Sequence, residues 1–134
     1  MQTSGLASLL VSGANGFVGL ALCREGIRRG MRIKATTHSA CPLPAATEQV
    51  VTGSIDQKSS WDNALQGVDV VSHLAARVHV MQESSANPQA EFRRVNVAGT
   101  ERLERAAVAS GVKRLVYVSS IKVNGETTMA GQRY

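Results

Sequence analysis

The amino-acid sequence predicts an α/β fold: a Rossmann-type, doubly wound parallel sheet that is truncated after about five strands. The first ground for this expectation is a short apolar run at residues 9–11, which leads into a glycine-spaced turn and then an amphipathic helix. The second is that strand-like apolar runs alternate with helical periodicity along the rest of the chain, as in right-handed βαβ units. The third is that distinctive polar and glycine residues follow the expected strands, where parallel sheets bind their ligands.

The expected elements follow from local signals at their ends. Gly30 and Gly111 stand where helices should stop, because glycine tolerates the left-handed backbone of a helix C-terminus. Asn87 followed by Pro88 indicates a helix start, and Ser-Ser-Trp-Asp at 59–62 indicates the start of a shorter helix with a serine cap. In chain order, the expected strands are 8–12, 31–36, 49–53, 68–74 and 114–119, and the expected helices are 17–29, a short segment after 59, and 87–110.

The turn from Gly13 to Gly19 has three glycines, each separated from the next by two residues, between a strand and a helix, which is the context of dinucleotide binding. Gly13 allows the tight turn, Gly16 lets a pyrophosphate approach the backbone, and Gly19 lets the helix pack closely on the strand. The helix N-terminus adds unpaired N–H groups and the positive end of its dipole. The same glycines could also form a plain strand-to-helix turn.

The composition limits the classes of protein to which the chain can belong. With 134 residues it should form one domain, 1–134. Its net charge of +5 comes from basic residues scattered in ones and twos, which argues against nucleic-acid binding. No apolar run of about 18 residues and no signal segment is evident, so we expect a cytoplasmic protein without membrane contact. Cys23 and Cys41 lack the spacing of metal ligands, so neither a metal site nor a disulfide is expected.

The charges after the glycine turn bear on the choice of nicotinamide cofactor, because no acidic residue occurs between Glu25 and Glu48. NAD-selective Rossmann folds place an Asp or Glu about 20 residues beyond the glycines, where it binds the ribose 2′-hydroxyl. Here the end of the second expected strand offers Thr37 and His38. The missing carboxylate removes repulsion against a 2′-phosphate, although no arginine clamp is evident. We therefore expect NAD or NADP as cofactor, with NADP favoured.

Four motifs occur in the order seen in extended short-chain dehydrogenases/reductases: the Gly13 turn, His-Leu-Ala-Ala at 73–76, Asn-Val-Ala-Gly-Thr at 96–100, and Val-Ser-Ser-Ile-Lys-Val-Asn-Gly at 118–125. The chain thus resembles the NAD-dependent epimerase/dehydratase family, which acts on nucleotide sugars. Residues 74–81 and 119–126 resemble a narrower bacterial branch of surface-polysaccharide biosynthesis, the UDP-4-keto-6-deoxy-N-acetylhexosamine 4-reductases and UDP-sugar 4-epimerases. The resemblance implies a UDP-sugar substrate, hydride transfer and a homodimer.

The resemblance also implies which residues form the site. Ser120 matches the catalytic Ser/Thr, whose hydroxyl would bond the substrate carbonyl or alkoxide and stabilise developing charge. Ser54 stands where the family usually has an Asp beside adenine. Together with the two residues after the second strand, the expected cofactor-binding residues are Gly13, Asn15, Gly16, Phe17, Val18, Gly19, Thr37, His38, Ser54, Ile55, Leu74, Ala75, Ala76, Asn96 and Ser119.

Several of these residues also have a purely structural interpretation. The alanines at 75–76 can serve close packing alone, Asn96 can bridge backbone in the core, and Ser119 can simply end a strand. His73 and His79 are expected to be structural, since no acid–base partner stands at a recognisable spacing.

The family's general acid, a tyrosine followed four residues later by a lysine, is not found in the sequence. Tyr117 lies inside the fifth expected strand with Ile121 at the partner position, and Tyr134 is the last residue. We therefore expect the N-terminal, cofactor-binding part of a longer enzyme, inactive by itself. The alternatives are a non-catalytic dinucleotide sensor and the remnant of a truncated gene. A sheet that stops at its fifth strand exposes an edge and apolar surface, so self-association is expected there or through the helix 87–110.

Overall fold

The computed structural model describes residues 6–77, 84–120, 127 and 130–131. Its centre is a sheet of five parallel strands in the order β3-β2-β1-β4-β5. The strands are β1 (Ser8–Ser12), β2 (Arg32–Thr37), β3 (Thr47–Val51), β4 (Val70–His73) and β5 (Arg114–Tyr117). The chain runs from β1 outward to β3 and then crosses back to the other side of β1, which is the strand order of a Rossmann fold. The predicted fold class is confirmed.

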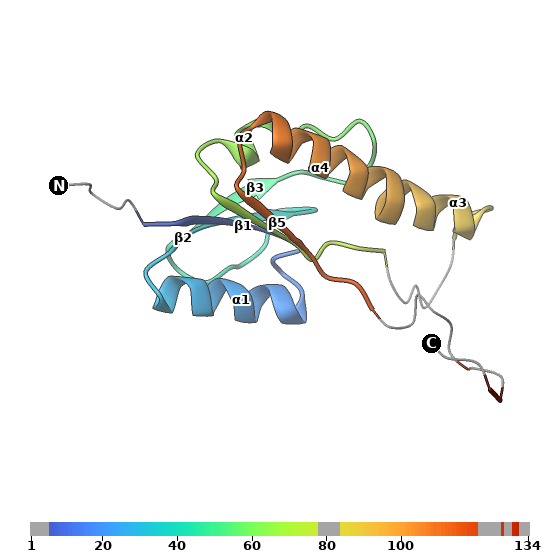
Figure 1. Ribbon diagram of the computed structural model, residues 1–134, viewed down its shortest axis with the longest axis horizontal. Helices are drawn as coiled ribbons and strands as arrows, with labels where there is room; N and C mark the ends of the chain where they lie inside the picture. Colours follow the sequence, from blue (N-terminus) through green and yellow to red (C-terminus); the bar gives the residue numbers. More distant parts are fainter. Residues whose placement is uncertain (1–5, 78–83, 121–126, 128–129, 132–134) are drawn as a thin grey trace.

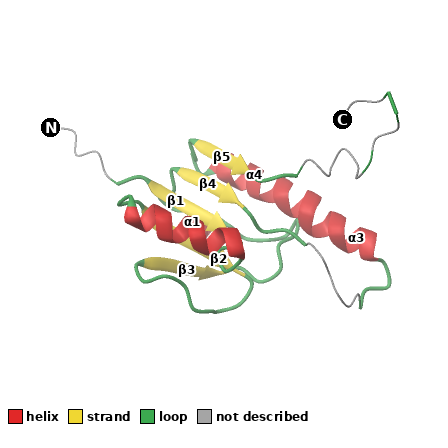
Figure 2. Cartoon of the chain, turned by 90° about the horizontal axis from the view of Figure 1, so that it is seen from below, coloured by secondary structure: helices red, strands yellow, loops and turns green. Residues whose placement is uncertain are grey.

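Helices cover both faces of this sheet. Figure 1 shows α1 (Phe17–Arg28) on one face, and α2 (Asp62–Leu65) and α4 (Thr100–Ala109) on the other. α4 follows directly on α3 (Pro88–Arg93) and on the π-helical turn η1 (Arg94–Gly99). The predicted helix 87–110 is therefore present, but the π-helical winding of its middle was not predicted. Figure 2 shows β3 and β5 at the two edges of the sheet.

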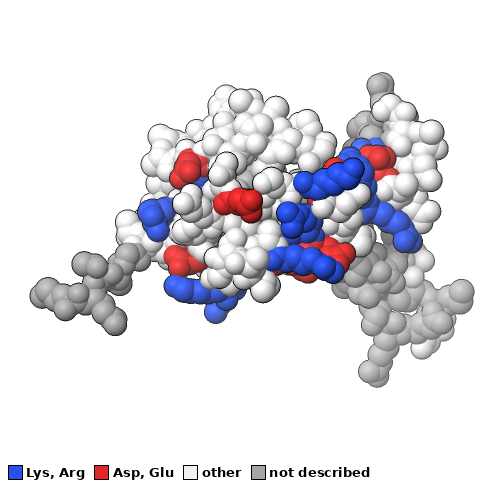
Figure 3. All heavy atoms as spheres, turned by 90° about the horizontal axis from the view of Figure 1, so that it is seen from above, with Lys and Arg blue, Asp and Glu red and all other residues white. Residues whose placement is uncertain are grey.

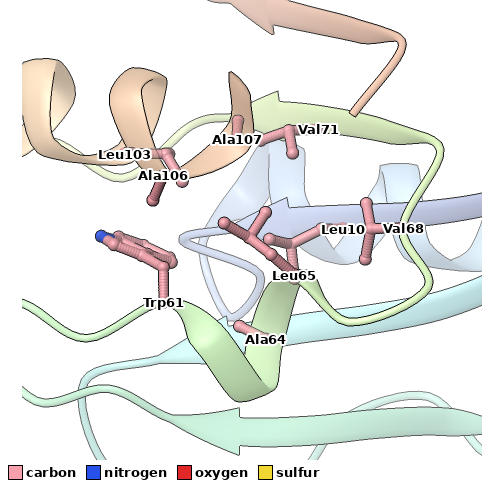
Figure 4. Packing of buried hydrophobic residues seen from close by; sticks show 9 residues of the cluster. All are labelled: Leu10, Trp61, Ala64, Leu65, Val68, Val71, Leu103, Ala106 and Ala107. Carbon is pink, nitrogen blue, oxygen red and sulfur yellow. The ribbon is translucent and has the colours of Figure 1, made fainter. Parts of the chain in front are cut away.

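The central strand β1 is buried along its whole length because its alternate side chains enter two different helical layers. Leu10 and Val71 point towards α2 and α4, where they pack with Trp61, Leu65 and Leu103 (Figure 4). The opposite face of the sheet packs on α1 through a second cluster formed by Leu9, Val11, Ala14, Cys23, Ile33 and Ala35. Cys23 is thus a core residue, and burial raises the pKa of its thiol. Both cysteines are free.

Most helix ends agree with their local signals. Asn87 caps α3, and its Oδ1 accepts a hydrogen bond from the backbone N–H of Ala90 at 3.1 Å. Gly30 and Gly111 follow α1 and α4 with φ angles of 76° and 75°, a conformation that favours glycine. No helix in the described ranges is both long enough and apolar enough to cross a bilayer.

The prediction that a serine caps α2 was wrong. The Ser59 hydroxyl accepts a hydrogen bond from the backbone N–H of Asp56 at 2.9 Å and donates one to the Ser54 carbonyl at 3.2 Å. It therefore closes the turn before α2, whose N-cap position is occupied by Trp61 without a side-chain bond. Burial of the large Trp61 ring against the core places the helix start, so tertiary packing overrides the local capping signal.

Candidate functional site

A pocket lies where the carboxyl ends of β1, β2, β3 and β4 meet. Its volume is about 360 Å³, which lies in the range of small-molecule sites. Residues at the ends of these four strands, or just after them, line it, and η1 adds two side chains. The lining residues are Gly13, Asn15, Thr36, Thr37, His38, Thr52, Gly53, Ser54, Ile55, Ala75, Ala76, Arg77, Arg94 and Val95. This is the edge of the sheet at which the sequence predicted a dinucleotide site.

Glycines shape one wall of the pocket, because the turn after β1 lies against the segment after β4. Gly13 has a φ angle of 68°, and a Cβ at this position would lie 2.8 Å from the Ala75 nitrogen. A Cβ on Gly19 would overlap the Gly13 carbonyl oxygen and lie 2.7 Å from Ala14 Cα. Both positions therefore require glycine for close approach, as the spacing of the turn indicated.

The first turn of α1 opens to solvent beside this wall. Gly16 occupies the N-cap position, and the first helical hydrogen bond runs from Leu20 N–H to the Gly16 carbonyl at 2.9 Å. The N–H groups of the three residues between them have no partner within a helix of this geometry. Phe17 is 96% exposed, so no described residue covers the helix N-terminus there. An anion at this position would meet free N–H groups and the positive end of the helix dipole.

The pocket lining carries positive charge. Arg77 and Arg94 belong to it, and the lining residues, all of them in the described part of the chain, include no aspartate or glutamate. At the mouth, His38 Nε2 lies 3.4 Å from the Ser54 hydroxyl oxygen, so these two side chains meet across the loops that follow β2 and β3. A lining of cations and hydroxyls without a carboxylate suits an anionic ligand.

Arg94 joins η1 to the loop after β3. Its Nη2 lies 2.9 Å from Glu91 Oε2, and its Nη1 lies 3.3 Å from Asp56 Oδ2. These carboxylates, Glu91 foremost, raise the pKa of Arg94, so its guanidinium stays charged. On the same side, Gly99 allows the helix to approach Ile55, because a Cβ at Gly99 would lie 2.6 Å from Ile55 Cγ2. The helix and the loop therefore form one wall.

A buried chain of side-chain hydrogen bonds runs beneath the pocket. The Ser12 hydroxyl oxygen lies 2.6 Å from His73 Nδ1, and His73 Nε2 lies 2.9 Å from Thr100 Oγ1. The Thr100 hydroxyl donates its only hydrogen to the Asn96 carbonyl at 3.0 Å, so it can only accept from His73. His73 is therefore protonated on Nε2, and its Nδ1 accepts from Ser12. Burial lowers the pKa of His73, which favours this neutral form.

Asn96 holds the far end of the wall after β4. Its Oδ1 accepts a hydrogen bond from Arg77 N–H at 2.7 Å, and its Nδ2 donates one to the Arg77 carbonyl at 3.0 Å. The side chain thus bridges backbone, which is the structural interpretation left open for it. It does not line the pocket itself, but it fixes a residue that does.

The structure brings together about half of the predicted site residues. Those that line the pocket are Gly13, Asn15, Thr37, His38, Ser54, Ile55, Ala75 and Ala76. Gly16, Phe17, Val18, Gly19, Leu74 and Asn96 lie in the elements that bound it but are not part of its lining. Ser119 and Ser120 follow β5 as exposed residues outside the lining. His79, Lys122 and Tyr134 lie outside the described residues.

The predicted binding set did not include Thr36, Thr52, Gly53, Arg77, Arg94 and Val95, which also line the pocket. Arg94 and Val95 lie one and two residues before Asn96, within the π-helical turn. Their proximity in sequence to Asn96 was the only signal that could have indicated them. Widened turns of this kind are frequent at functional sites, because they change which side chains face a neighbouring element.

A larger hollow of about 480 Å³ lies on the outer side of α4 and is lined by Gln57, Lys58, Ala98, Glu101, Arg102 and Arg105. Figure 3 shows the charged side chains that gather on this face. Arg105 pairs with Glu101 at 2.6 Å, and Arg102 donates to the Ser59 carbonyl at 3.1 Å, so these two arginines already have partners. None of the residues that line the hollow also lines the pocket at the strand ends. We therefore assign the candidate site to the smaller pocket.

Comparisons with known proteins show which family the chain resembles. The model of the NAD-dependent epimerase/dehydratase family matches residues 9–132. The chain is 39% identical over 126 residues to the UDP-glucose 4-epimerase of Vibrio cholerae, covering 92% of this chain and 38% of that protein. It is 35% identical over 133 residues to a 3β-hydroxysteroid dehydrogenase/Δ5→4-isomerase of Mycobacterium tuberculosis, covering 97% of this chain and 35% of that protein. The structure of MoeE5 in complex with UDP-glucuronic acid and NAD superposes with a TM-score of 0.76 at 32% identity, covering 91% of this chain and 40% of that one. The chain thus spans a little over a third of the length of the curated relatives it matches.

Proposed function

The chain belongs to the NAD-dependent epimerase/dehydratase family, and we propose that it is the NAD(P)-binding portion of an enzyme that reduces or epimerises a UDP-sugar by hydride transfer. The observation that carries this proposal is the pocket at the strand ends, where Gly13 leaves room for the Ala75 backbone and no carboxylate lines the wall. A bound nicotinamide cofactor would supply the hydride acceptor or donor for the reaction.

The residues present fit such a cofactor. The turn 13–19 and the open first turn of α1 offer backbone N–H groups for a pyrophosphate. Ser54 and Ile55 lie where the adenine is expected, and Ile55 packs on Gly99 to form an apolar surface for the base. Leu74 to Ala76 form the wall along which the cofactor ribose is expected. The chain's own part is to bind and orient the cofactor.

The cofactor preference that we propose is NADP over NAD. Thr37 ends β2, where NAD-selective folds carry an acid, and its hydroxyl oxygen accepts a hydrogen bond from Gln49 Nε2 at 3.1 Å. His38, next to it, is exposed at the pocket mouth. A 2′-phosphate placed there would meet an imidazole and hydroxyls, with no negative charge in the lining to repel it.

The UDP-sugar substrate is inferred from the relatives. The Vibrio cholerae relative is named for UDP-glucose, and MoeE5 binds UDP-glucuronic acid. We place the parent enzyme in cytoplasmic polysaccharide biosynthesis, in agreement with the sequence motifs at 74–81 and 119–126. Because no tyrosine in this sequence is followed four residues later by lysine, we expect the chain alone to bind cofactor without turning over a ketosugar.

The experiment that tests this proposal is a calorimetric titration of the chain with NADPH and NADH side by side. Binding of both, with NADPH tighter, is the expected result. Tighter binding of NADH would overturn the NADP preference and leave the binding function intact. A folded sample that binds neither would overturn the proposed function.

A further inference from the structure

The backbone wall after β4 is fastened at two points, and both lead to the same helical turn. The paired residues of β1 and β4 end at Ser12 and His73, and the last backbone hydrogen bond between them runs from Leu74 N–H to the Ser12 carbonyl at 3.2 Å. The Ser12 hydroxyl shares this Leu74 N–H, at 3.1 Å, and extends the hold on the wall by one residue, because it also accepts a hydrogen bond from Ala75 N–H at 3.2 Å. Further along, Asn96 holds Arg77 by two hydrogen bonds.

The orientation of the Ser12 hydroxyl depends on His73. Ala75 N–H and the shared Leu74 N–H both donate to the Ser12 hydroxyl oxygen, so the hydroxyl hydrogen is directed to His73 Nδ1, which accepts it at 2.6 Å. This requires the hydrogen of His73 to be on Nε2, where Thr100 accepts it at 2.9 Å. Thr100 can accept there because its own hydrogen is directed to the Asn96 carbonyl. Ser12, His73 and Thr100 therefore each donate one hydrogen bond to the next group, and all three bonds run in the direction of the Asn96 carbonyl.

We propose that His73 is a positioning residue: with Ser12 and Thr100, it sets where the wall 74–77 stands relative to η1, and through that wall it sets the affinity for the dinucleotide. The affinity part of this inference rests on the proposed function. The turn and the wall are in close contact, because a Cβ on Gly13 would lie only 2.8 Å from the Ala75 nitrogen. A shift of the wall would therefore change the space available between turn and wall.

Thr100 is the residue at which to test the hydrogen-bonded chain, because it does not line the pocket and its hydroxyl bonds to His73 Nε2 and the Asn96 carbonyl. Thr100→Val keeps the shape of the side chain and removes both the acceptor and the donor. Thr100→Ser restores the hydroxyl. Thr47→Val is the matched control, since Thr47 Oγ1 is buried without a hydrogen-bond partner among the described residues. Thr47 lies at the amino end of β3, whereas the pocket lies at the carboxyl ends of the strands.

The first measurement uses nuclear magnetic resonance without ligand. In the unmodified chain, the imidazole nitrogens of His73 should show the Nε2–H tautomer, and the Ala75 amide should exchange slowly. Thr100→Val should mix the tautomers and speed exchange of Ala75, whereas Thr100→Ser and Thr47→Val should not. A merely packing role for Thr100 would not move the tautomer. An unchanged tautomer together with unchanged exchange in Thr100→Val overturns the proposal.

The second measurement is the affinity of the same variants for NADPH and NADH. Thr100→Val should bind both about tenfold more weakly, as expected for loss of one buried hydrogen bond that orders a site. Thr100→Ser should recover most of the loss. Equal affinity of Thr100→Val and the unmodified chain overturns the proposal. If the unmodified chain binds neither dinucleotide, the proposed function fails, while the tautomer and exchange data still decide whether His73 positions the wall.

A variant that does not fold would not answer the question, so His73→Gln and His73→Asn provide a second route. The glutamine amide reaches the position of Nε2 and retains the contact with Thr100, whereas the asparagine amide reaches that of Nδ1 and retains the contact with Ser12. If an unbroken series of hydrogen bonds is required, both variants should speed exchange of the Ala75 amide and weaken binding of NADPH and NADH. Binding as tight as that of the unmodified chain in either variant contradicts the proposal.

Discussion

The side-chain amide of Asn96 pairs with the backbone of Arg77 as a neighbouring strand would, with hydrogen bonds of 2.7 Å and 3.0 Å. A helical residue thereby takes over where the β-sheet ladder has ended. Asn96 lies inside the π-helical turn, and the same turn presents Arg94 and Val95 to the pocket. One local change of helical winding thus supplies a support and two lining residues.

We expect Asn96→Asp to destabilise the fold by about 1–3 kcal/mol, because the exchange leaves an acceptor facing the Arg77 carbonyl in place of a donor. Denaturant unfolding at neutral pH measures the loss. Asn63→Asp, on the exposed surface of α2, is the matched control and should stay close to the unmodified chain. If both variants unfold at the same denaturant concentration, the Arg77 contact contributes nothing to stability.

Two glycines of α1 should respond differently to alanine. Gly19→Ala would drive a Cβ into the Gly13 carbonyl and towards Ala14 Cα, both backbone atoms. Gly26→Ala would meet Ile33 Cδ1 at 2.5 Å, the far end of a flexible side chain. Since alanine gains about 1 kcal/mol in helix propensity, we expect Gly26→Ala to be nearly neutral and Gly19→Ala to lose several-fold more stability than this gain. Thermal unfolding of both variants checks this; equal melting temperatures would contradict it.

Cofactor preference should depend on charge at the end of β2. His38→Asp places a carboxylate at the pocket mouth, where it would repel a 2′-phosphate and could accept from a 2′-hydroxyl. We expect the ratio of NADPH to NADH affinity to fall by about tenfold or more. Asn63→Asp adds the same charge outside the pocket and should leave the ratio unchanged. A ratio unaffected by His38→Asp would place the ribose elsewhere.

We expect self-association through the open edge at β5. Val116 and Tyr117 are 44% and 51% exposed there, next to backbone groups that pair with no further strand among the described residues. Val116→Lys should shift sedimentation towards monomer, whereas Val51→Lys, at the β3 edge, should not. Val108, 81% exposed on α4, tests the other surface. Dissociation by Val108→Lys alone would assign the contact to the helix.

Stability should fall with acidification through His73. Burial lowers the pKa of His73 from the ordinary value of 6.5. Just below pH 6.5, His73 is therefore protonated in the unfolded chain but still largely neutral in the folded chain. The contribution is complete above about pH 6.5 and is lost as pH falls towards the folded pKa, with a slope of at most about 1.4 kcal/mol per pH unit. The predicted loss is checked by measuring the free energy of unfolding from about pH 7.5 to about pH 5, a range that brackets the titration of histidine. His73→Gln should remove that part of the slope; an identical slope would contradict it.

The elements that the sequence predicted well depend on signals within a few residues of one another. Gly19 is required by contacts inside a single turn, and Asn87 caps a helix that begins at the next residue. The central strand β1 was recognisable because it is buried along its whole length and is continuously apolar at residues 9–11. Their ends were less well placed: β4 and β5 are shorter than expected.

The sequence by itself determined a parallel α/β sheet with a glycine-rich turn at its carboxyl edge, because hydrophobic periodicity and turn chemistry act locally. Only the tertiary structure decided that Ser59 closes a turn, that Arg94 and Val95 reach the pocket, and that Ser12, His73 and Thr100 form one hydrogen-bonded chain. Those three residues are 61 and 27 positions apart along the chain. Such partners are brought together by strand order and helix packing, so no pattern within a single element indicates them.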